Sequence, residues 1–83
     1  METFKRGKLV KSKAGHDIGR LYVIIDVDDA YVYLADGRIR TLDKLKKKKK
    51  KHVQIINQEF DITNADDVSI RQLIKSWNRE EEK

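Results

Sequence analysis

The feature that most constrains the fold is a series of short β-strand patterns separated by tight turns. The segment 20–27, RLYVIIDV, is dense in β-branched and aromatic residues, and 31–35, YVYLA, repeats this pattern after a three-residue connection. Segments 8–13 and 52–56 are shorter strand candidates. Four short strands in the first part of the chain favour a β structure over a helical one.

A further strand is predicted from the dipeptide Asp36-Gly37. Asp-Gly is favoured in two-residue hairpin turns, because both central positions of a type I′ turn have φ > 0. The segment 38–42, RIRTL, alternates in character and is expected to return as a strand. About five strands with tight turns predict a mainly β fold, a small SH3-like barrel that leaves few sheet edges unpaired. We expect this barrel to span residues 1–57, with a lysine-rich loop at 44–51.

The chain changes character after the barrel. Residues 58–83 are expected to form a linker and an amphipathic helix with an acidic tail. The helix is predicted over 64–83, with Asn64 as N-cap and two aspartates in the first turn. Along it runs an apolar stripe at i, i+3, i+4, i+7 spacing, formed by Ile70, Leu73, Ile74 and Trp77. This stripe either packs on the barrel or binds a partner protein.

Length and composition limit the classes of protein that remain. A chain of 83 residues forms at most one small domain, and without cysteine it has neither disulfides nor thiolate metal sites. No apolar run is long enough to cross a bilayer, and the N-terminal residues lack the apolar core of a signal peptide. We therefore expect a cytoplasmic protein with no membrane partner.

Charge is distributed unevenly along the chain. Residues 1–52 contain 15 Lys/Arg and 7 Asp/Glu, whereas residues 53–83 contain 4 and 7. A basic first part and an acidic second part predict a polyanion-binding face on the first part alone.

No group of residues favours catalysis. His16 and His52 each lie among basic residues and lack the spacing of zinc ligands. The segment 15–19, GHDIG, is too short for a phosphate-binding P-loop and lacks its Gly-Lys-Ser/Thr end. We expect no enzymatic activity, no metal, no cofactor and no small-molecule substrate.

The loop after the first strand combines glycines with basic residues. Lys11 and Lys13 lead into a turn bracketed by Gly15 and Gly19, and Arg20 follows. Glycines let the backbone turn sharply and leave main-chain N–H groups uncovered, while basic side chains hold phosphates. A plain β-turn explains the two glycines equally well.

At these residues the sequence resembles the KOW family, the RNA-binding modules of ribosomal proteins and transcription elongation factors. The match is closest to large-subunit ribosomal proteins of the L-fourteen-e type and their short bacterial relatives. Their order is K-x-A-G-x-x-x-G-[KR], an apolar strand ending near Asp, an acidic turn, a second apolar strand, a Gly turn and a basic block before His-Leu. The matching positions here are Lys13, Ala14, Gly15, Gly19, Arg20, the strand to Asp26, Asp28-Asp29, YVYLADG, Lys46 to Lys51 and His52-Val53.

The resemblance covers residues 6 to 55 and implies an SH3-like barrel that binds ribosomal RNA without a cofactor. The long helical extension of the ribosomal proteins is replaced here by a short acidic helix. Both a structural component of the ribosome and a translation-associated accessory protein therefore remain open.

The lysine block is the most basic part of the chain. Lys44 and Lys46 to Lys51 put seven lysines in eight positions. Like charges disfavour both a central strand and an isolated helix, so the block is expected to be an extended, mobile loop. As a bare charge run it is a solvated loop or a nuclear localisation signal. Between two strands and close to the basic first loop, it is predicted to bind phosphates.

The leading hypothesis is a non-catalytic module that binds RNA. Its expected partner is ribosomal RNA or the large ribosomal subunit. The alternatives are an SH3-like module that docks on an acidic protein partner and a DNA-binding protein. Tyr31 and Tyr33 share one strand face, where packing is favoured over base stacking. Two sets of residues are predicted to contact RNA: first Lys11, Lys13, Gly15, His16, Gly19 and Arg20, and second Arg38, Arg40, Lys44, Lys46, Lys47, Lys48, Lys49, Lys50, Lys51 and His52.

Overall fold

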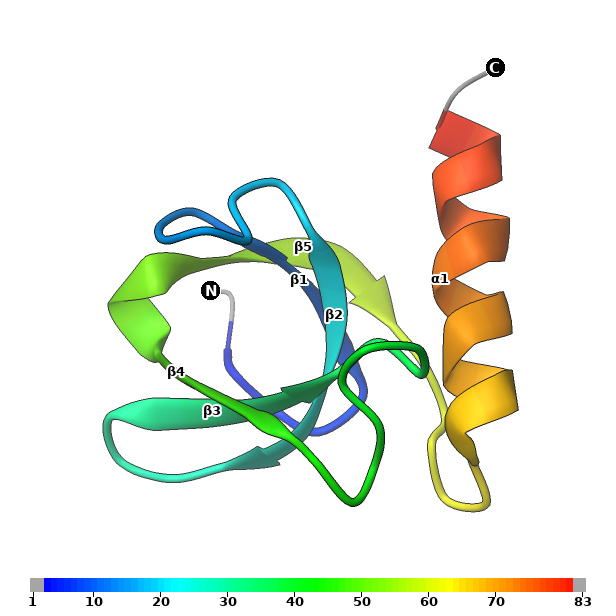
Figure 1. Cartoon of the computed structure of the whole chain (residues 1–83), viewed down its shortest axis with the longest axis horizontal. Helices are drawn as coiled ribbons and strands as arrows, with labels where there is room; N and C mark the ends of the chain where they lie inside the picture. The colour runs from blue at the N-terminus through cyan, green and yellow to red at the C-terminus, as the bar shows by residue number, and fades with distance from the viewer. Residues whose placement is uncertain (1–2, 82–83) are drawn as a thin grey trace.

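The computed structural model describes residues 3–81, which form one antiparallel β-sheet and one C-terminal helix. The sheet curls into a small barrel with the helix beside it (Figure 1), which confirms the predicted mainly β fold. The predicted end of the helix at residue 83 lies outside the described residues. The elements are β1 (Lys8–Ser12), β2 (Leu21–Val27), β3 (Tyr31–Ala35), β4 (Lys46–Lys49), the 3-10 helix η1 (Lys50–His52), β5 (Val53–Glu59) and α1 (Asp67–Glu81).

The strand order in the sheet is β4-β3-β2-β1-β5. Strands β1 to β4 follow one another as a meander, and β5 returns to pair with β1. The register shifts between Ile24 and Asp26 in the β2–β3 ladder. Such an irregularity increases the local bend and twist of a strand, which helps a short sheet to close on itself.

The interior of the barrel is an apolar cluster built from alternate strand positions. In a strand, successive side chains point to opposite faces, so residues two apart share a face. Val10, Tyr22, Ile24, Val32 and Leu34 are buried together in this way, and Val53 and Ile55 complete the cluster from β5.

α1 covers part of the opposite face of the sheet, over β1, β2 and the end of β3. Leu9, Val23 and Ala35 occupy the intervening strand positions and are fully buried against Ile70 of the helix. Ile74 and Trp77 are half-buried against the same cluster. The apolar stripe of the helix therefore packs on the protein's own barrel.

The helix begins at Asp67, so its N-cap is Asp66, two residues after the cap predicted at Asn64. Asp66 Oδ1 accepts a hydrogen bond from the Ser69 amide at 2.8 Å, which is the contact of an N-cap side chain with the first turn. The pKa of the Asp66 carboxyl is lowered by this bond. The prediction of Asn64 as the cap was wrong, because Asn64 lies in the turn that precedes the helix.

The predicted hairpin at Asp36-Gly37 and the predicted strand 38–42 were also wrong. Residues 36–45 form a loop against the start of α1, and the Asp36 side chain accepts hydrogen bonds from the amides of Arg38 and Arg40, each at 2.9 Å. These bonds coil the backbone locally and prevent a strand ladder. Gly37 has φ +77°, and a Cβ on it would overlap the Asp67 carbonyl oxygen.

The fourth strand lies in the lysine block itself, which was predicted as a mobile loop. Lys46 to Lys49 form β4 at the edge of the sheet, and η1 follows directly. An edge position leaves one side of the strand without a neighbouring strand, where like charges are better tolerated than in the centre of a sheet. Among residues 3–81, no helix has the length and apolar character needed to cross a membrane.

Candidate nucleic-acid interface

The lysines of β4 are divided between the two faces of the sheet. In the antiparallel ladder with β3, Lys46 and Lys48 lie opposite Leu34 and Val32, which belong to the interior cluster. Paired residues share a face, so these two lysines point to the interior side of the strand.

The other two lysines of β4 lie on the outer face. Lys47 is paired with Tyr33, and Lys49 is paired with Tyr31. Both lysines are exposed, and both tyrosines are half-buried. Because successive side chains of a strand point to opposite faces, the unbroken lysine run contains two kinds of lysine, one on each face, with different surroundings.

Lys48 is held in a nearly buried ion pair. Its Nζ lies 3.0 Å from Asp17 Oδ1 and donates a second hydrogen bond to the Ala14 carbonyl oxygen at 2.8 Å. The Lys48 side chain is only 9% exposed. Lys46 Nζ lies farther from the same carboxylate, at 3.9 Å from Oδ2. Lys48 thus binds the first loop of its own chain.

Asp17 is the centre of a fully hydrogen-bonded network. Besides Lys48, its carboxylate accepts hydrogen bonds from Ser12 Oγ at 2.9 Å and Tyr22 Oη at 2.8 Å. Burial opposes the charged form, but the three donors outweigh it and hold the pKa of the Asp17 carboxyl well below its usual range. Burial and the adjacent carboxylate raise the pKa of Tyr22. Asp17 therefore remains charged and locks the loop to β4.

The loop 13–20 is closed tightly at its base. The Ser12 amide donates to the Arg20 carbonyl oxygen and the Gly19 amide donates to the Ser12 carbonyl oxygen, both at 3.0 Å. Gly15 and Gly19 both have φ +88°, a conformation that residues with a Cβ rarely adopt. Lys13, His16 and Arg20 are exposed on this loop. Lys11, also exposed, lies at the end of β1 that leads into it.

The loop also contacts the segment that follows β4. The Lys13 amide donates to the His52 carbonyl oxygen at 2.8 Å, which joins the loop to the end of η1. Lys51 is exposed in η1, and His52 is half-buried. Lys50 is partly occupied by internal contacts, because its Nζ donates to the Asp29 carbonyl oxygen at 3.1 Å.

Exposed basic groups thus follow one another from the first loop through η1 to the outer face of β4. Figure 1 shows β4 and η1 on the side of the barrel away from α1, and the loop across the top of the barrel. Lys47 and Lys49 lie on the face of β4 opposite to Lys48, the lysine that contacts the loop. We call this set the basic band; it consists of Lys13, His16, Arg20, Lys47, Lys49 and Lys51.

An aromatic ring lies within the basic band. Lys47 Nζ is 4.3 Å from the centroid of the Tyr31 ring, a cation–π distance. Tyr33 Oη donates a hydrogen bond to Asp28 Oδ2 at 2.7 Å, which raises the pKa of Tyr33 and lowers the pKa of Asp28. Tyr33 is therefore fixed to the β2–β3 turn, whereas Tyr31 contacts a lysine of the band.

Three of the predicted basic residues lie in a different part of the molecule. Arg38, Arg40 and Lys44 belong to the loop 36–45, which is bound to the start of α1. The Leu42 amide donates to Asp67 Oδ1 at 2.8 Å and fixes this loop to the helix. The structure brings the first loop together with Lys46 to His52, and it separates both from the arginines of loop 36–45.

Two residues of the first loop were absent from the predicted site. Asp17 is the partner of Lys48, and a lone carboxylate in a basic, glycine-bracketed loop was the signal for it. Ile18 is the most exposed of the large apolar residues in the described part of the chain. An apolar residue in a turn otherwise composed of Gly, Ala and polar residues was the corresponding signal.

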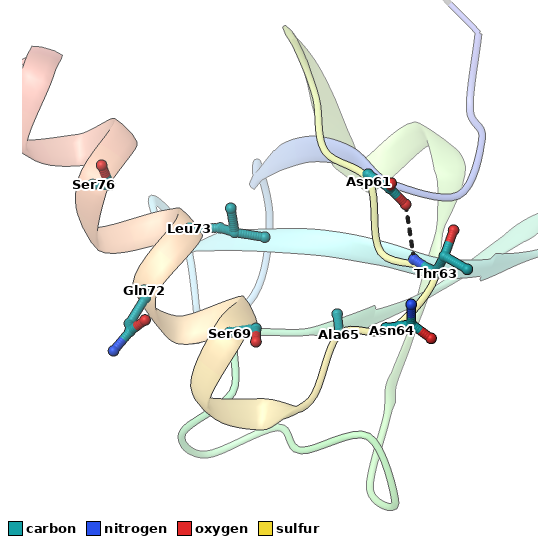
Figure 2. Close-up of a pocket in the computed structure, with 8 residues that line it drawn as sticks. All are labelled: Asp61, Thr63, Asn64, Ala65, Ser69, Gln72, Leu73 and Ser76. Atoms are coloured by element: carbon teal, nitrogen blue, oxygen red, sulfur yellow. Dashed lines mark hydrogen bonds between the residues drawn. The ribbon is translucent and has the colours of Figure 1, made fainter.

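A shallow hollow of about 460 Å³ lies on the other side of the molecule, between α1 and the linker that precedes it. In Figure 2, Leu73 extends from α1 toward the linker and Gln72 points away from it, while Asp61 is bonded to the Thr63 amide at 3.0 Å. The polar groups around the hollow do not converge on one point. Among residues 3–78, whose side chains the structure describes, no group of three or more His, Asp or Glu side chains could hold a metal ion.

Comparison with known proteins does not assign the chain to a family. No family model and no curated protein sequence matches it. The function is therefore inferred from the geometry of the basic band and the loop 13–20.

Proposed function

We propose that the protein is a non-catalytic RNA-binding module of KOW type that contacts ribosomal RNA, or the large ribosomal subunit, through the basic band. One observation carries the proposal: β4 presents Lys47 and Lys49 on its outer face, while Lys48 between them is neutralised internally by Asp17. The strand therefore acts as a fixed support for exposed cations. The proposed setting is the cytoplasm.

The rigidity of the lysines' backbone supports the proposal. A mobile lysine loop loses conformational freedom when it binds a polyanion, whereas a strand has already lost it during folding. Lys47 and Lys49 are two positions apart on one strand face, so their Cα atoms are about 7 Å apart. Two cations at this separation can engage different phosphates of one backbone.

The identity of the cations determines what they contribute to binding. Lysine is a compact point charge with weak geometric preference, so it provides affinity for phosphates and little reading of sequence. If Lys13, Lys47, Lys49 and Lys51 each engage one phosphate, log K falls with log[salt] with a slope of about −3 to −4. RNA binding that depends strongly on salt is therefore expected.

An acidic protein is the competing class of partner, because lysines also pair with carboxylates. The geometry favours RNA for one reason: Tyr31 lies within the basic band, beside Lys47. Aromatic rings stack on unpaired bases, and this contact has no counterpart in a plain acidic peptide.

Filter binding over a salt series tests the proposal with three probes: a ribosomal RNA fragment, duplex DNA of equal length and polyglutamate. The expected order of affinity places ribosomal RNA first at physiological salt. Equal affinity for RNA and polyglutamate would assign the band to acidic proteins instead. Preference for duplex DNA would replace RNA by DNA as the ligand.

A further inference from the structure

Ile18 is an exposed apolar side chain within a basic loop. It is 65% exposed and lies between the buried Asp17 and Gly19. Exposed turn positions are usually occupied by glycine or short polar residues, since these fit the backbone and remain hydrated. Single exposed apolar residues are common on proteins, so the surroundings of Ile18 decide what it can do.

The backbone that carries Ile18 is held from both sides. The Ile18 amide donates to the Gly15 carbonyl oxygen at 3.4 Å, and the Arg20 amide donates to the Asp17 carbonyl oxygen at 2.9 Å. The preceding side chain, Asp17, is fixed by three hydrogen bonds in the barrel. Ile18 is therefore displayed on a loop that has little further entropy to lose on binding.

The electrostatic surroundings of Ile18 are positive. Lys13, His16 and Arg20 of the same loop are exposed, and Asp17, the one carboxylate of this loop, is turned inward to Lys48. A ligand that reaches Ile18 must therefore combine negative charge with an accessible apolar surface. RNA with unpaired nucleotides has both, because phosphates flank bases whose faces are uncovered.

We propose that Ile18 packs on an unpaired nucleotide of the bound RNA, so that the loop 13–20 selects RNA with a bulge or a loop over continuous duplex. This inference rests on the proposed RNA-binding function and specifies its substrate class. In a continuous A-form duplex the base faces are covered by stacking, and the shallow minor groove presents mainly hydroxyls and base edges. Ile18 has no apolar surface to bury there.

A lipid surface is a weaker match to the same residues. Partition into a membrane interface requires an extended apolar face next to the cations. The other exposed large apolar residues of the described chain, Ile39 and Val68, lie in loop 36–45 and on α1 instead. Ile18 alone then supplies the apolar contact. The area of one side chain matches the face of a single nucleotide better than the surface of a bilayer.

The test compares two RNA hairpins with equal numbers of phosphates, each closed by a non-nucleotide tether in place of loop nucleotides, one with a fully paired stem and one with a few unpaired nucleotides in the stem. The wild-type protein should bind the bulged hairpin more tightly. Ile18→Ser should lower this preference by about tenfold, the factor expected for the loss of one partly buried isoleucine contact. Affinity for the paired hairpin should stay at the wild-type value.

Ile39→Ser is the matched control, because Ile39 is 62% exposed and the substitution is the same. Both variants should melt at the wild-type temperature, since neither removes a buried side chain. A preference that is unchanged by Ile18→Ser, or lowered equally by Ile39→Ser, would overturn the inference while leaving RNA binding intact.

Two further outcomes distinguish a failure of the inference about Ile18 from a failure of the proposed RNA-binding function. If the wild-type protein binds neither hairpin, the proposed RNA-binding function fails and the inference fails with it. Vesicles containing phosphatidylserine form the last arm of the test. If Ile18→Ser weakens vesicle binding but leaves the preference between the two hairpins unchanged, Ile18 contacts a lipid surface instead.

Discussion

Lys48 extends from β4 toward the interior of the barrel, and its Nζ donates a hydrogen bond to Asp17 Oδ1 at 3.0 Å. Both side chains are about one-tenth exposed. The two residues are 31 positions apart, and their contact joins the first loop to the lysine strand. This pair assigns a structural role to Lys48 and leaves Lys47 and Lys49 exposed on the outer face of β4.

Removal of Lys48 should destabilise the protein. Lys48→Met leaves the Asp17 carboxylate with only the more distant Lys46 as a cation, which lowers the free energy of unfolding by up to about 3–5 kcal/mol. Lys49→Met should have little effect on stability, because Lys49 is exposed. Urea denaturation of the two variants measures the difference. Equal stability of both would show that the ion pair contributes nothing.

Replacement of both partners tests the pair itself. In the double variant Asp17→Asn/Lys48→Met neither member of this pair is left charged without the other, so the loss of stability should be smaller than the sum of the two single losses. Strictly additive losses in this double-mutant cycle would contradict a direct interaction between Asp17 and Lys48.

Asp17 should also make the stability of the protein depend on pH. Its pKa in the folded state is lowered below the unfolded value of about 3.9. The resulting stabilisation is fully present above the unfolded pKa and is lost as the pH falls toward the folded pKa. Below about pH 5 the wild-type protein should therefore lose more stability than Asp17→Asn in parallel urea titrations. Parallel pH profiles for the two proteins would contradict this assignment.

Most of the strands and the helix could be predicted from the sequence, because local residue patterns specify them. The strands around Val23 and Val32 have β-branched residues in alternation, and the stripe at Ile70 has helical spacing. The strand in the lysine block could not be predicted this way. Its pattern contains no apolar residue, and Lys48 is paired with Asp17, a partner 31 positions away.

The error at residues 38–42 has a similar cause. The alternation of RIRTL is a valid strand pattern, but Asp36 binds the amides of Arg38 and Arg40 and Gly37 is pressed against α1. Contact with a distant helix overrode a local preference. For the same reason the sequence grouped these arginines with the lysines, while the structure separates them.

Gly37 should tolerate substitution poorly. Its φ is +77°, and a Cβ would meet the Asp67 carbonyl oxygen and the Arg71 amide. Gly37→Ala should therefore lower the melting temperature more than Gly19→Ala, whose φ is +88° but whose surroundings are open within 4 Å. Gly19→Ala should cost only about 1 kcal/mol of backbone strain. An equal fall in melting temperature for both would contradict the close packing of loop 36–45 on α1.

Ile70 should be the residue that attaches α1 to the sheet. It is fully buried against Leu9, Val23 and Ala35, so Ile70→Ala should cost about 2–5 kcal/mol. Leu73→Ala, on the same stripe but only half-buried, should cost less. Thermal unfolding monitored by Trp77 fluorescence reports both changes. A helix that packs on a partner instead would leave both variants as stable as the wild type.

The salt dependence of RNA binding tests the basic band most directly, with two variants that each remove three positive charges. Lys47→Gln/Lys49→Gln/Lys51→Gln removes them from the band, and Arg38→Gln/Lys44→Gln/Lys75→Gln removes them from loop 36–45 and α1. The first variant should reduce the slope of log K against log[salt] by about 2 to 3, and the second should leave it at the wild-type value. Equal changes in slope for both variants would show that net charge, and not the basic band, binds the RNA.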